Sequence, residues 1–470
     1  MTVRVRKIVF GLLIMMALLV GAFFSVGGMQ VVRLMRGPEL PPTPRTPTPA
    51  SDVAYLKQAV LRNERGATSA QFAHFVRTID AAPAANTPDD FTVIASQALA
   101  QLDNAHSTLS ELVMRRLPIR LHWLADGLIV VKARPDQAAL LGRKIVEIGG
   151  LSPDDLVGRA AELVGGGTPG WVRFRSEYFL SAPAALRALG AITSGATVVV
   201  RATDPAGSMV TTPLTAEPEI APCATFWAWR DSLPGDASCG TQGWVTLLKP
   251  DSSLPLYLQE PSNLFLLRDL TEHDAVYLRM SGSVDDRNET AAQFTRRASN
   301  TLRQTGRRNA IVDFRYNWGG SFNLSLPFTK AIATAIPPNG RIYLITGPNT
   351  FSAGLIAASQ FKRYAASRLS VVGEDVGDRL RFRAEGMLVT MPATGAEAYI
   401  TSAWDDVLED CGWFSDCWPP GKFLLRGVGT LTPDLRVANT WDSYIHGQDR
   451  IVEAVSMDIT RRRNSPVEPK

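Results

Sequence analysis

The sequence predicts an α/β protein whose largest domain is a mainly parallel sheet covered by helices. Short apolar segments that are typical of buried strands occur at 273–281, 307–317, 340–347 and 368–374. Helical patterns at 289–305 and 323–336 alternate with them. Strands that alternate with helices usually form a parallel sheet with helices on its faces, and its ligands are expected in the loops at the strand ends.

Length and charge narrow the possible functions. The chain has 470 residues, of which 45% are hydrophobic and 20% charged, so it can bury a large core and form two or three domains. The formal net charge is only +4, and no Lys/Arg run is interleaved with aromatic residues. This distribution argues against a nucleic-acid partner.

The N-terminus, 1–36, is expected to be a membrane anchor. Residues 8–32 form an apolar stretch that is long enough to cross a bilayer. A cleaved signal peptide, the alternative, usually has a shorter apolar core and a small-residue cleavage site. Arg4, Arg6 and Lys7 precede the stretch, which favours a cytoplasmic N-terminus with the remaining chain outside.

Composition divides the remaining chain into further segments. The Pro/Thr-rich segment 37–53 is expected to be a stiff, extended spacer that holds the globular part off the membrane. Helical patterns then predict an N-terminal helical segment over 54–125, including one long pattern at 88–117. A β-rich module over 126–216, a connector over 217–260, the α/β core over 261–460 and a tail over 461–470 complete the prediction.

The β-rich module resembles a PDZ domain. The segment 144–164, "KIVEIGGLSPDDLVGRAAELV", has the strand, the glycine and the helix of such modules, although a long insertion at 165–195 follows. PDZ-like modules bind extended peptides by adding them to a sheet edge, so the resemblance implies a site for a polypeptide substrate. A small β-rich spacer is the alternative interpretation.

The four cysteines favour an oxidising compartment. Cys223 lies close in sequence to Cys239, and Cys411 to Cys417, each pair in a stretch rich in Gly, Pro or Trp. Two short-range disulfides are the favoured interpretation, with four free thiols as the alternative. A metal site is not expected, because neither pair has CxxC spacing and no histidine lies near either.

The loop "DFRYNWGG" is the first candidate for chemistry. Gly319 and Gly320 follow a predicted buried strand, and glycines let backbone N–H groups approach a ligand, as an oxyanion hole requires. Asp313 and Arg315 lie two residues apart and could pair with each other. A plain glycine turn is the alternative.

The loop "NTFSAG" is the second candidate. It places Ser352 between a strand and a helix, where it is either a nucleophile or only a helix cap. A serine nucleophile needs a base, and among the five histidines His106, in "QLDNAHSTLSE", has the most polar surroundings. Lys362 is an unsuitable base, because it lies ten residues further along the same predicted helix.

Together these motifs resemble the S41 peptidases, the tail-specific or C-terminal processing proteases. "LDNAHSTL", "DFRYNWGG", "NTFSAG", "VVGE" and "LTPDLRV" occur in the family's order. The resemblance implies a ClpP/crotonase-like core of repeated ββα units. It also implies a serine endopeptidase that acts by acyl transfer, without a cofactor or metal, on the outer side of a bacterial inner membrane.

The resemblance also implies roles for individual residues. Ser352 matches the nucleophile, His106 the base of the Ser-His branch, and Gly319 and Ala353 the oxyanion hole, with Asn317 shaping the site. The lysine base of the better-known branch is missing, since Asp378 and Arg379 occupy its expected place.

The orienting acid is the least certain of these roles. The Ser-His branch carries a glutamate shortly before the "PD" strand, where this chain has no acid. Glu374 is the first substitute, followed by Glu409 and Asp410. An inactive, peptide-binding scaffold at the membrane is therefore the alternative function, and an esterase that uses the same residues is a third.

Overall fold

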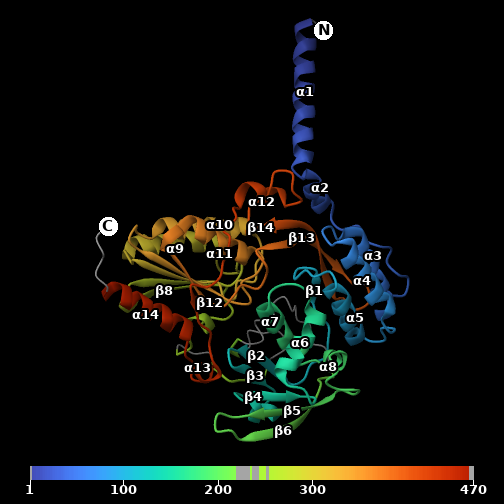
Figure 1. Ribbon diagram of the computed structural model, residues 1–470, viewed down its shortest axis with the longest axis vertical. Coiled ribbons are helices and arrows are strands. Elements are labelled where there is room, and N and C mark those ends of the chain that lie inside the picture. Colours follow the sequence, from blue (N-terminus) through green and yellow to red (C-terminus); the bar gives the residue numbers. More distant parts are fainter. Residues whose placement is uncertain (1–2, 219–232, 236–242, 250–252, 465–470) are drawn as a thin grey trace.

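The computed structural model describes residues 3–218, 233–235, 243–249 and 253–464. Helix α1 (Val3–Ser25) stands away from the rest of the molecule, and a sharp bend joins it to α2 (Gly28–Arg36) (Figure 1). Among the described residues, no single helix meets the length and hydropathy expected of a membrane span. The pair Val9–Ser25 and Gly28–Arg36, bent by 80°, meets them together.

The Pro-rich segment that follows, predicted as a stiff, extended spacer, makes contacts with the helix after it. The backbone N–H of Glu39 donates to Asn63 Oδ1 (2.8 Å), and Arg62 donates to the carbonyl of Leu40 (3.1 Å). These contacts hold the segment against α3 (Pro49–Asn63), which begins inside the predicted spacer because Thr48 caps it.

Three helices form the N-terminal segment: α3, α4 (Ser69–Ala81) and α5 (Pro88–Ala100). Each begins with a capping box in which a threonine side chain accepts from the third helical N–H. The helix predicted over 88–117 ends at Ala100, and strand β1 (Thr108–Glu111) follows. Asp103 has a positive φ of 48°, which turns the chain there, and pairing with a distant strand then outweighs the local helical pattern.

The β-rich module is an antiparallel sheet with the order β2-β3-β4-β5-β6. Its strands are β2 (Ile119–Leu124), β3 (Gly127–Ala133), β4 (Lys144–Ile148), β5 (Thr197–Thr203) and β6 (Met209–Thr215), with β7 (Val245–Thr246) beside β3. Its helices are η1 (Pro135–Leu140), α6 (Pro153–Val164), α7 (Pro169–Phe179) and α8 (Pro183–Ala188). The sheet therefore begins before residue 126, because β2 forms a hairpin with β3.

The core is a six-stranded sheet with the order β15-β12-β11-β10-β9-β8, parallel except for the β8–β9 hairpin. Its strands are β8 (Phe265–Leu270), β9 (Ala275–Met280), β10 (Asn309–Asp313), β11 (Arg341–Thr346), β12 (Leu369–Gly373) and β15 (Leu435–Arg436). Helices α9 (Ala291–Thr305), α10 (Phe322–Ala335), α11 (Ala353–Ala365) and α14 (Arg450–Asn464) accompany it (Figure 1).

Alternate residues of the core strands face two separate apolar layers. Val312 and Leu344 pack with the residues of α9, α10 and α11. Ile311 and Ile345 face the opposite side, where they pack with Val455 and its neighbours in α14. Because the strands are buried on both faces, they appear in the sequence as continuous apolar runs.

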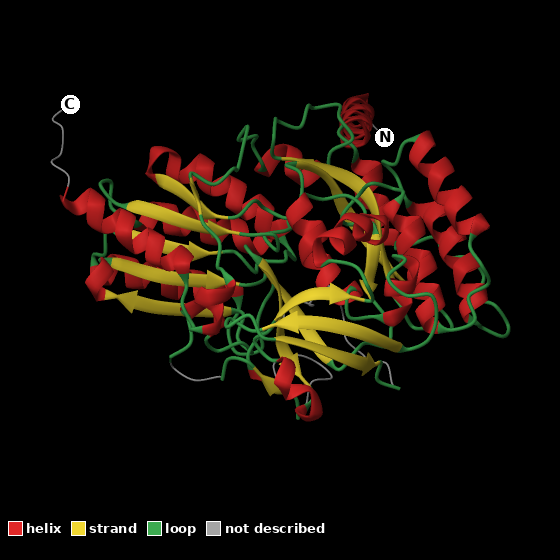
Figure 2. Ribbon diagram, turned by 60° about the horizontal axis from the view of Figure 1, so that its bottom comes forward, coloured by secondary structure: helices red, strands yellow, loops and turns green. Residues whose placement is uncertain are grey.

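A third sheet, of order β1-β14-β13, joins the N-terminal segment to the core. Strands β13 (Arg381–Thr390) and β14 (Glu397–Asp406) form a long hairpin, and β1 pairs with β14. Figure 2 shows the strands of the molecule gathered into separate sheets, with helices beside them. The pairing of β1 with β14, which are far apart in the sequence, therefore places the segment just before β1 beside the core.

The smaller elements include α12 (Pro419–Leu424), which lies against the bend between α1 and α2 (Figure 1). The others are α13 (Trp441–Ile445), η4 (Leu256–Leu258), η5 (Thr271–His273) and η6 (Ala366–Arg368). Cys411 and Cys417 form a disulfide next to α12, as predicted. Cys223 and Cys239 lie outside the described residues.

Candidate active site

Ser352 lies on a strained turn between β11 and α11. Its φ and ψ angles are 51° and −128°, a conformation that residues other than glycine rarely adopt. The turn is held by three hydrogen bonds: Gly347 N–H donates to Thr350 Oγ1 (3.0 Å), Thr350 Oγ1–H to the carbonyl of Phe314 (2.8 Å), and Phe351 N–H to that of Asn317 (2.9 Å). Ser352 makes no side-chain capping bond to α11. A strained serine between a strand and a helix is typical of a nucleophile turn.

The glycine loop lies directly against this turn. A Cβ atom on Gly319 would lie 2.5 Å from Ser352 Cβ, so only a glycine fits at this position, whose φ is 109°. The backbone N–H of Ala353 lies at the first position of α11, where no intrahelical acceptor exists. The N–H of Gly319 donates to Asn317 Oδ1 (3.2 Å), which also accepts from Ser283 Oγ (3.3 Å). Gly320 pairs with Ser283 and fixes the other side of the loop.

His106 is brought to the same place from the N-terminal segment. Its ring stacks on the ring of Phe351, the residue before Ser352, with a centroid distance of 4.2 Å. Phe382 covers the opposite side at 5.3 Å, and the imidazole is only 3% exposed. Phe351 stacks in turn on Trp171 of the β-rich module (4.1 Å). The stack holds the imidazole plane in one orientation next to the serine turn.

Asp378 is the acid that faces His106. Its Oδ2 lies 3.3 Å from His106 Nδ1, an ion-pair distance whose angle does not meet hydrogen-bond geometry. Its other oxygen accepts from the N–H of Arg379 (2.8 Å). His106 Nε2 has no hydrogen-bond partner among the described residues. A carboxylate at Nδ1 with a free Nε2 is the arrangement that a serine base requires.

Glu374, the acid first proposed from the sequence, lies elsewhere. It follows β12 and lines a cavity between the core and the β-rich module, with His122 and Arg173. Burial raises the pKa of the Glu374 carboxyl, although Arg173, His122 and Arg315 act in the opposite direction. No hydrogen bond or ion pair joins it to His106 within the described chain.

Glu409 and Asp410, the further substitutes, make no hydrogen bond or ion pair with His106 within the described chain. Both are exposed and belong to the segment before the disulfide, where Asp410 Oδ1 accepts from the N–H of Gly427 (2.8 Å). Asp378 was noted in the sequence only as the residue near the missing lysine. Asp378 lies only four residues after Glu374, so the sequence could have suggested it as a second candidate acid. The direction of its side chain, however, depends on the fold.

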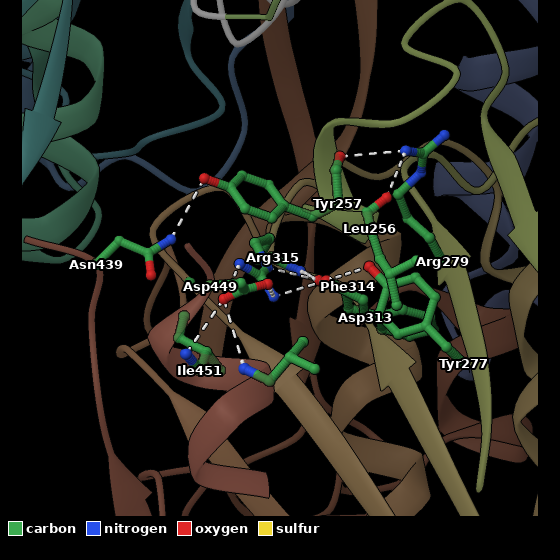
Figure 3. A network of polar contacts seen from close by, with 12 residues as sticks. Leu256, Tyr257, Tyr277, Arg279, Asp313, Phe314, Arg315, Asn439, Asp449 and Ile451 are labelled. Carbon is green, nitrogen blue, oxygen red and sulfur yellow. Dashed lines mark hydrogen bonds and ion pairs between the residues drawn. The ribbon is translucent and has the colours of Figure 1, made fainter. Parts of the chain in front are cut away.

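Asp313 and Arg315 pair as predicted, in the segment that leads from β10 to the glycine loop. Arg315 Nε donates to Asp313 Oδ1 (3.0 Å), and its two terminal nitrogens donate to Asp449 (3.1 and 2.9 Å). Tyr277 donates to the other oxygen of Asp313 (2.7 Å), and Tyr257 lies over the guanidinium (Figure 3). Asp449, which starts α14, was not identified from the sequence. The network fixes the backbone that leads to the glycines.

Within the described parts of the chain, no three His, Cys, Asp or Glu side chains are grouped closely enough to hold a metal ion. The candidate site consists instead of a serine, an imidazole, a carboxylate and backbone N–H groups, which is a set suited to acyl transfer.

The chain matches known proteins by structure but not by sequence. Neither a protein-family model nor a curated protein sequence matches it. Mature CPAF complexed with lactacystin is 12% identical, with a TM-score of 0.55 over 88% of this chain and 98% of that one. A mutant of CPAF is 12% identical, with a TM-score of 0.56 over 90% and 99%. The photosystem II D1 C-terminal processing protease is 15% identical, with a TM-score of 0.33 over 83% and 94%.

The likeness to CPAF extends over nearly the whole length of both chains, and CPAF is a peptidase of the S41 family. At this level of identity the likeness concerns the fold. The chain therefore shares the fold of CPAF, an S41 peptidase, which is the fold that the resemblance predicted.

Proposed function

We propose that the protein is a serine endopeptidase of the S41 type that cleaves polypeptides through Ser352. The observation that carries the proposal is the stacking of the His106 ring on Phe351, because it places an imidazole beside the strained serine turn. The two residues are separated by about 250 positions in sequence, and only the fold brings them together.

The mechanism follows from the groups present. His106 Nε2 accepts the proton of the Ser352 hydroxyl as its oxygen attacks the peptide carbonyl, and Asp378 holds the ring and stabilises the imidazolium. The N–H groups of Ala353 and Gly319 bind the oxyanion. The imidazolium then protonates the leaving amine, an acyl-serine forms, and water activated by the same imidazole hydrolyses it.

One observation favours the second candidate, a peptide-binding protein that does not cleave. The N–H of Gly319 already donates to Asn317 Oδ1, so only Ala353 presents a free donor in this conformation. Catalysis requires Gly319 to exchange that bond for the substrate oxygen. A chain that never makes this exchange would bind a peptide without turning it over.

Labelling with a fluorophosphonate probe separates the two candidates. A peptidase should be labelled, Ser352→Ala should abolish the labelling, and His106→Ala should reduce it severely. His74→Ala is the matched control, because His74 is exposed on α4 and distant in sequence from the serine turn. Labelling that persists in Ser352→Ala would remove this serine from the mechanism, and a wild type that binds peptides without being labelled would favour the scaffold.

We further propose that the N-terminal segment anchors the protein in a bacterial inner membrane, with the catalytic part on the outer side. Helix α1 exposes large apolar side chains such as Phe10 and Leu18. Trp413 and Phe414, next to the disulfide, are exposed near the α1–α2 bend, where interfacial aromatic residues would be expected. The disulfide is consistent with an oxidising compartment.

Membrane extraction tests this placement. The full chain should resist extraction from membranes at high pH, and its catalytic part should be accessible to protease added from the outer side. Release by alkaline carbonate, or protection from the added protease, would contradict the proposed anchor or its orientation.

A further inference from the structure

A cavity of about 80 Å³ lies at the carboxyl ends of β10, β11 and β12, facing the β-rich module. Its walls include Tyr316, Gly347 and Asn349 from the core and His122 and Arg173 from the module. The carboxyl ends of parallel strands are the usual binding edge of such sheets.

The cations in the wall of this cavity already have partners. Arg315 is shared between the carboxylates of Asp313 and Asp449, which carry more negative charge than it neutralises. Arg173 donates to the carbonyl of Leu124 (3.0 Å) and lies 4.3 Å over the ring of Trp123.

One acid in the wall is also engaged. Glu177 accepts from the N–H of Trp123 (2.8 Å), and the same oxygen contacts His122 Nδ1 (3.0 Å). This pair joins β2 to α7, so it stabilises the wall and offers little to a ligand.

Two hydrogen-bonding side chains in the wall remain without partners. The Glu374 carboxylate makes no hydrogen bond or ion pair with any described residue, and burial raises its pKa. Asn349 is 2% exposed, and neither its Oδ1 nor its Nδ2 has a hydrogen-bond partner in the described chain. Leaving the buried amide of Asn349 unpaired is unfavourable, and a ligand that pairs with it would relieve the cost. Glu374 is only half-buried, so its carboxylate is open to the same ligand.

We propose that this cavity is a subsite for a basic side chain, and best for the guanidinium of an arginine, in the polypeptide substrate. A guanidinium carries five N–H donors and can donate to both oxygens of one carboxylate. Glu374 would accept two of these hydrogen bonds, and Asn349 Oδ1 a third. The identification of the ligand as a polypeptide rests on the proposed peptidase function.

The position of the cavity connects it to the candidate active site. Asn349 precedes Ser352 by three residues, within the segment that forms the serine turn. Tyr316 precedes Gly319 by three residues, within the segment that forms the glycine loop. A substrate side chain held here would therefore contact both segments that position the reacting groups, and Glu374 would select the substrate.

Peptides that differ only in arginine or citrulline at one position test the inference, because citrulline has nearly the same shape without the charge. The position is moved along a fluorogenic peptide, and kcat/KM is measured for the full chain. We expect a preference for arginine of about 10- to 100-fold at one position, as charge-assisted hydrogen bonds usually confer. Glu374→Gln should reduce the ratio to near one by lowering kcat/KM for the arginine peptide.

Asp375→Asn is the matched control. It removes the same charge one residue away, from an exposed carboxylate that pairs with Arg436, and it should leave the arginine preference unchanged. Equal cleavage of both peptides at every position by the wild type, or a preference retained in Glu374→Gln, would overturn the inference.

A binding measurement keeps the subsite separate from catalysis. The Ser352→Ala variant of the full chain should bind the arginine peptide more tightly than the citrulline peptide in a calorimetric titration, and Ser352→Ala/Glu374→Gln should not. If the wild type cleaves nothing but Ser352→Ala still shows this preference, the subsite stands and the peptidase proposal fails. Equal binding of both peptides would refute the subsite, whatever the activity.

Discussion

The substitution Gly354→Ala tests whether the contact between α11 and the Asn317 segment sets the geometry of the active site. A Cβ atom at position 354 would lie 2.3 Å from the carbonyl oxygen of Asn317 and 2.6 Å from its Oδ1. Ordinary contact begins at 3.4 Å, so Asn317 must move by about 1.1 Å.

This displacement would act on both sides of the nucleophile. The carbonyl of Asn317 accepts from the N–H of Phe351, and its Oδ1 accepts from that of Gly319. A misplacement of about 1 Å commonly costs about 100-fold in rate. Overpacking costs about 1–3 kcal/mol of stability, of which the higher helix propensity of alanine returns up to about 1 kcal/mol.

The assay is the second-order rate constant for labelling by a fluorophosphonate, measured together with the midpoint of denaturant unfolding. We expect labelling about 100-fold slower and a loss of roughly 1–2 kcal/mol of stability. Gly158→Ala, in α6, is the control, since no atom lies within 4 Å of its Cβ position. A folded Gly354→Ala variant that is labelled at the wild-type rate would refute the reasoning.

Three further predictions concern other parts of the molecule. Asp378→Asn should slow labelling by a factor on the order of 10² to 10⁴, because an amide no longer stabilises the His106 imidazolium; labelling at the wild-type rate would exclude Asp378 as the orienting group. Burial raises the pKa of Glu385 to about 7 and that of the adjacent Asp405 well above its usual range. Because both folded pKa values exceed the unfolded values near 4, the contribution of this pair to stability should be largest below about pH 4 and be lost as the pH rises through about 7. Thermal unfolding should show a smaller decline in Asp405→Asn, and an equal decline would contradict the assignment. Cys411→Ser opens a seven-residue loop and should cost about 2 kcal/mol by loop-closure entropy, measured by denaturant unfolding; an unchanged midpoint would show that the disulfide is not stabilising.

The sequence alone identifies the serine turn and the glycine loop as candidates, and the structure places them against each other. Gly319, Ser352 and Ala353 lie in short motifs that directly follow apolar strands, and such motifs carry their geometry locally. His106 can be singled out as a candidate base from its polar surroundings, but its place beside the serine turn depends on the fold, since its contact with Phe351 spans about 250 residues. The local pattern around His106 in fact predicted a continuing helix.

The orienting acid could not be predicted from the sequence, for a physical reason. Glu374 and Asp378 follow the same strand, β12, and either could face the serine turn. The choice depends on how the intervening backbone runs: Gly377 N–H donates to the carbonyl of Thr350 (3.0 Å), and its own carbonyl accepts from Thr168 N–H of the β-rich module (3.1 Å). These long-range bonds direct Asp378 towards His106 and leave Glu374 in the cavity.

The attachment of α12 to the α1–α2 bend has a mechanical consequence. Lys422 Nζ donates to the carbonyls of Val26 (3.0 Å) and Ser415 (2.7 Å), and Gln30 donates to that of Asp416 (2.9 Å). The Pro-rich segment is also held against α3. The globular part of the protein is therefore fixed to the C-terminal end of α1 and has little freedom to move relative to that helix. If the protein is anchored through α1, Ser352 would then stay at a nearly constant height above the membrane. The distance of a peptide bond from the bilayer would then help to determine whether that bond is cleaved.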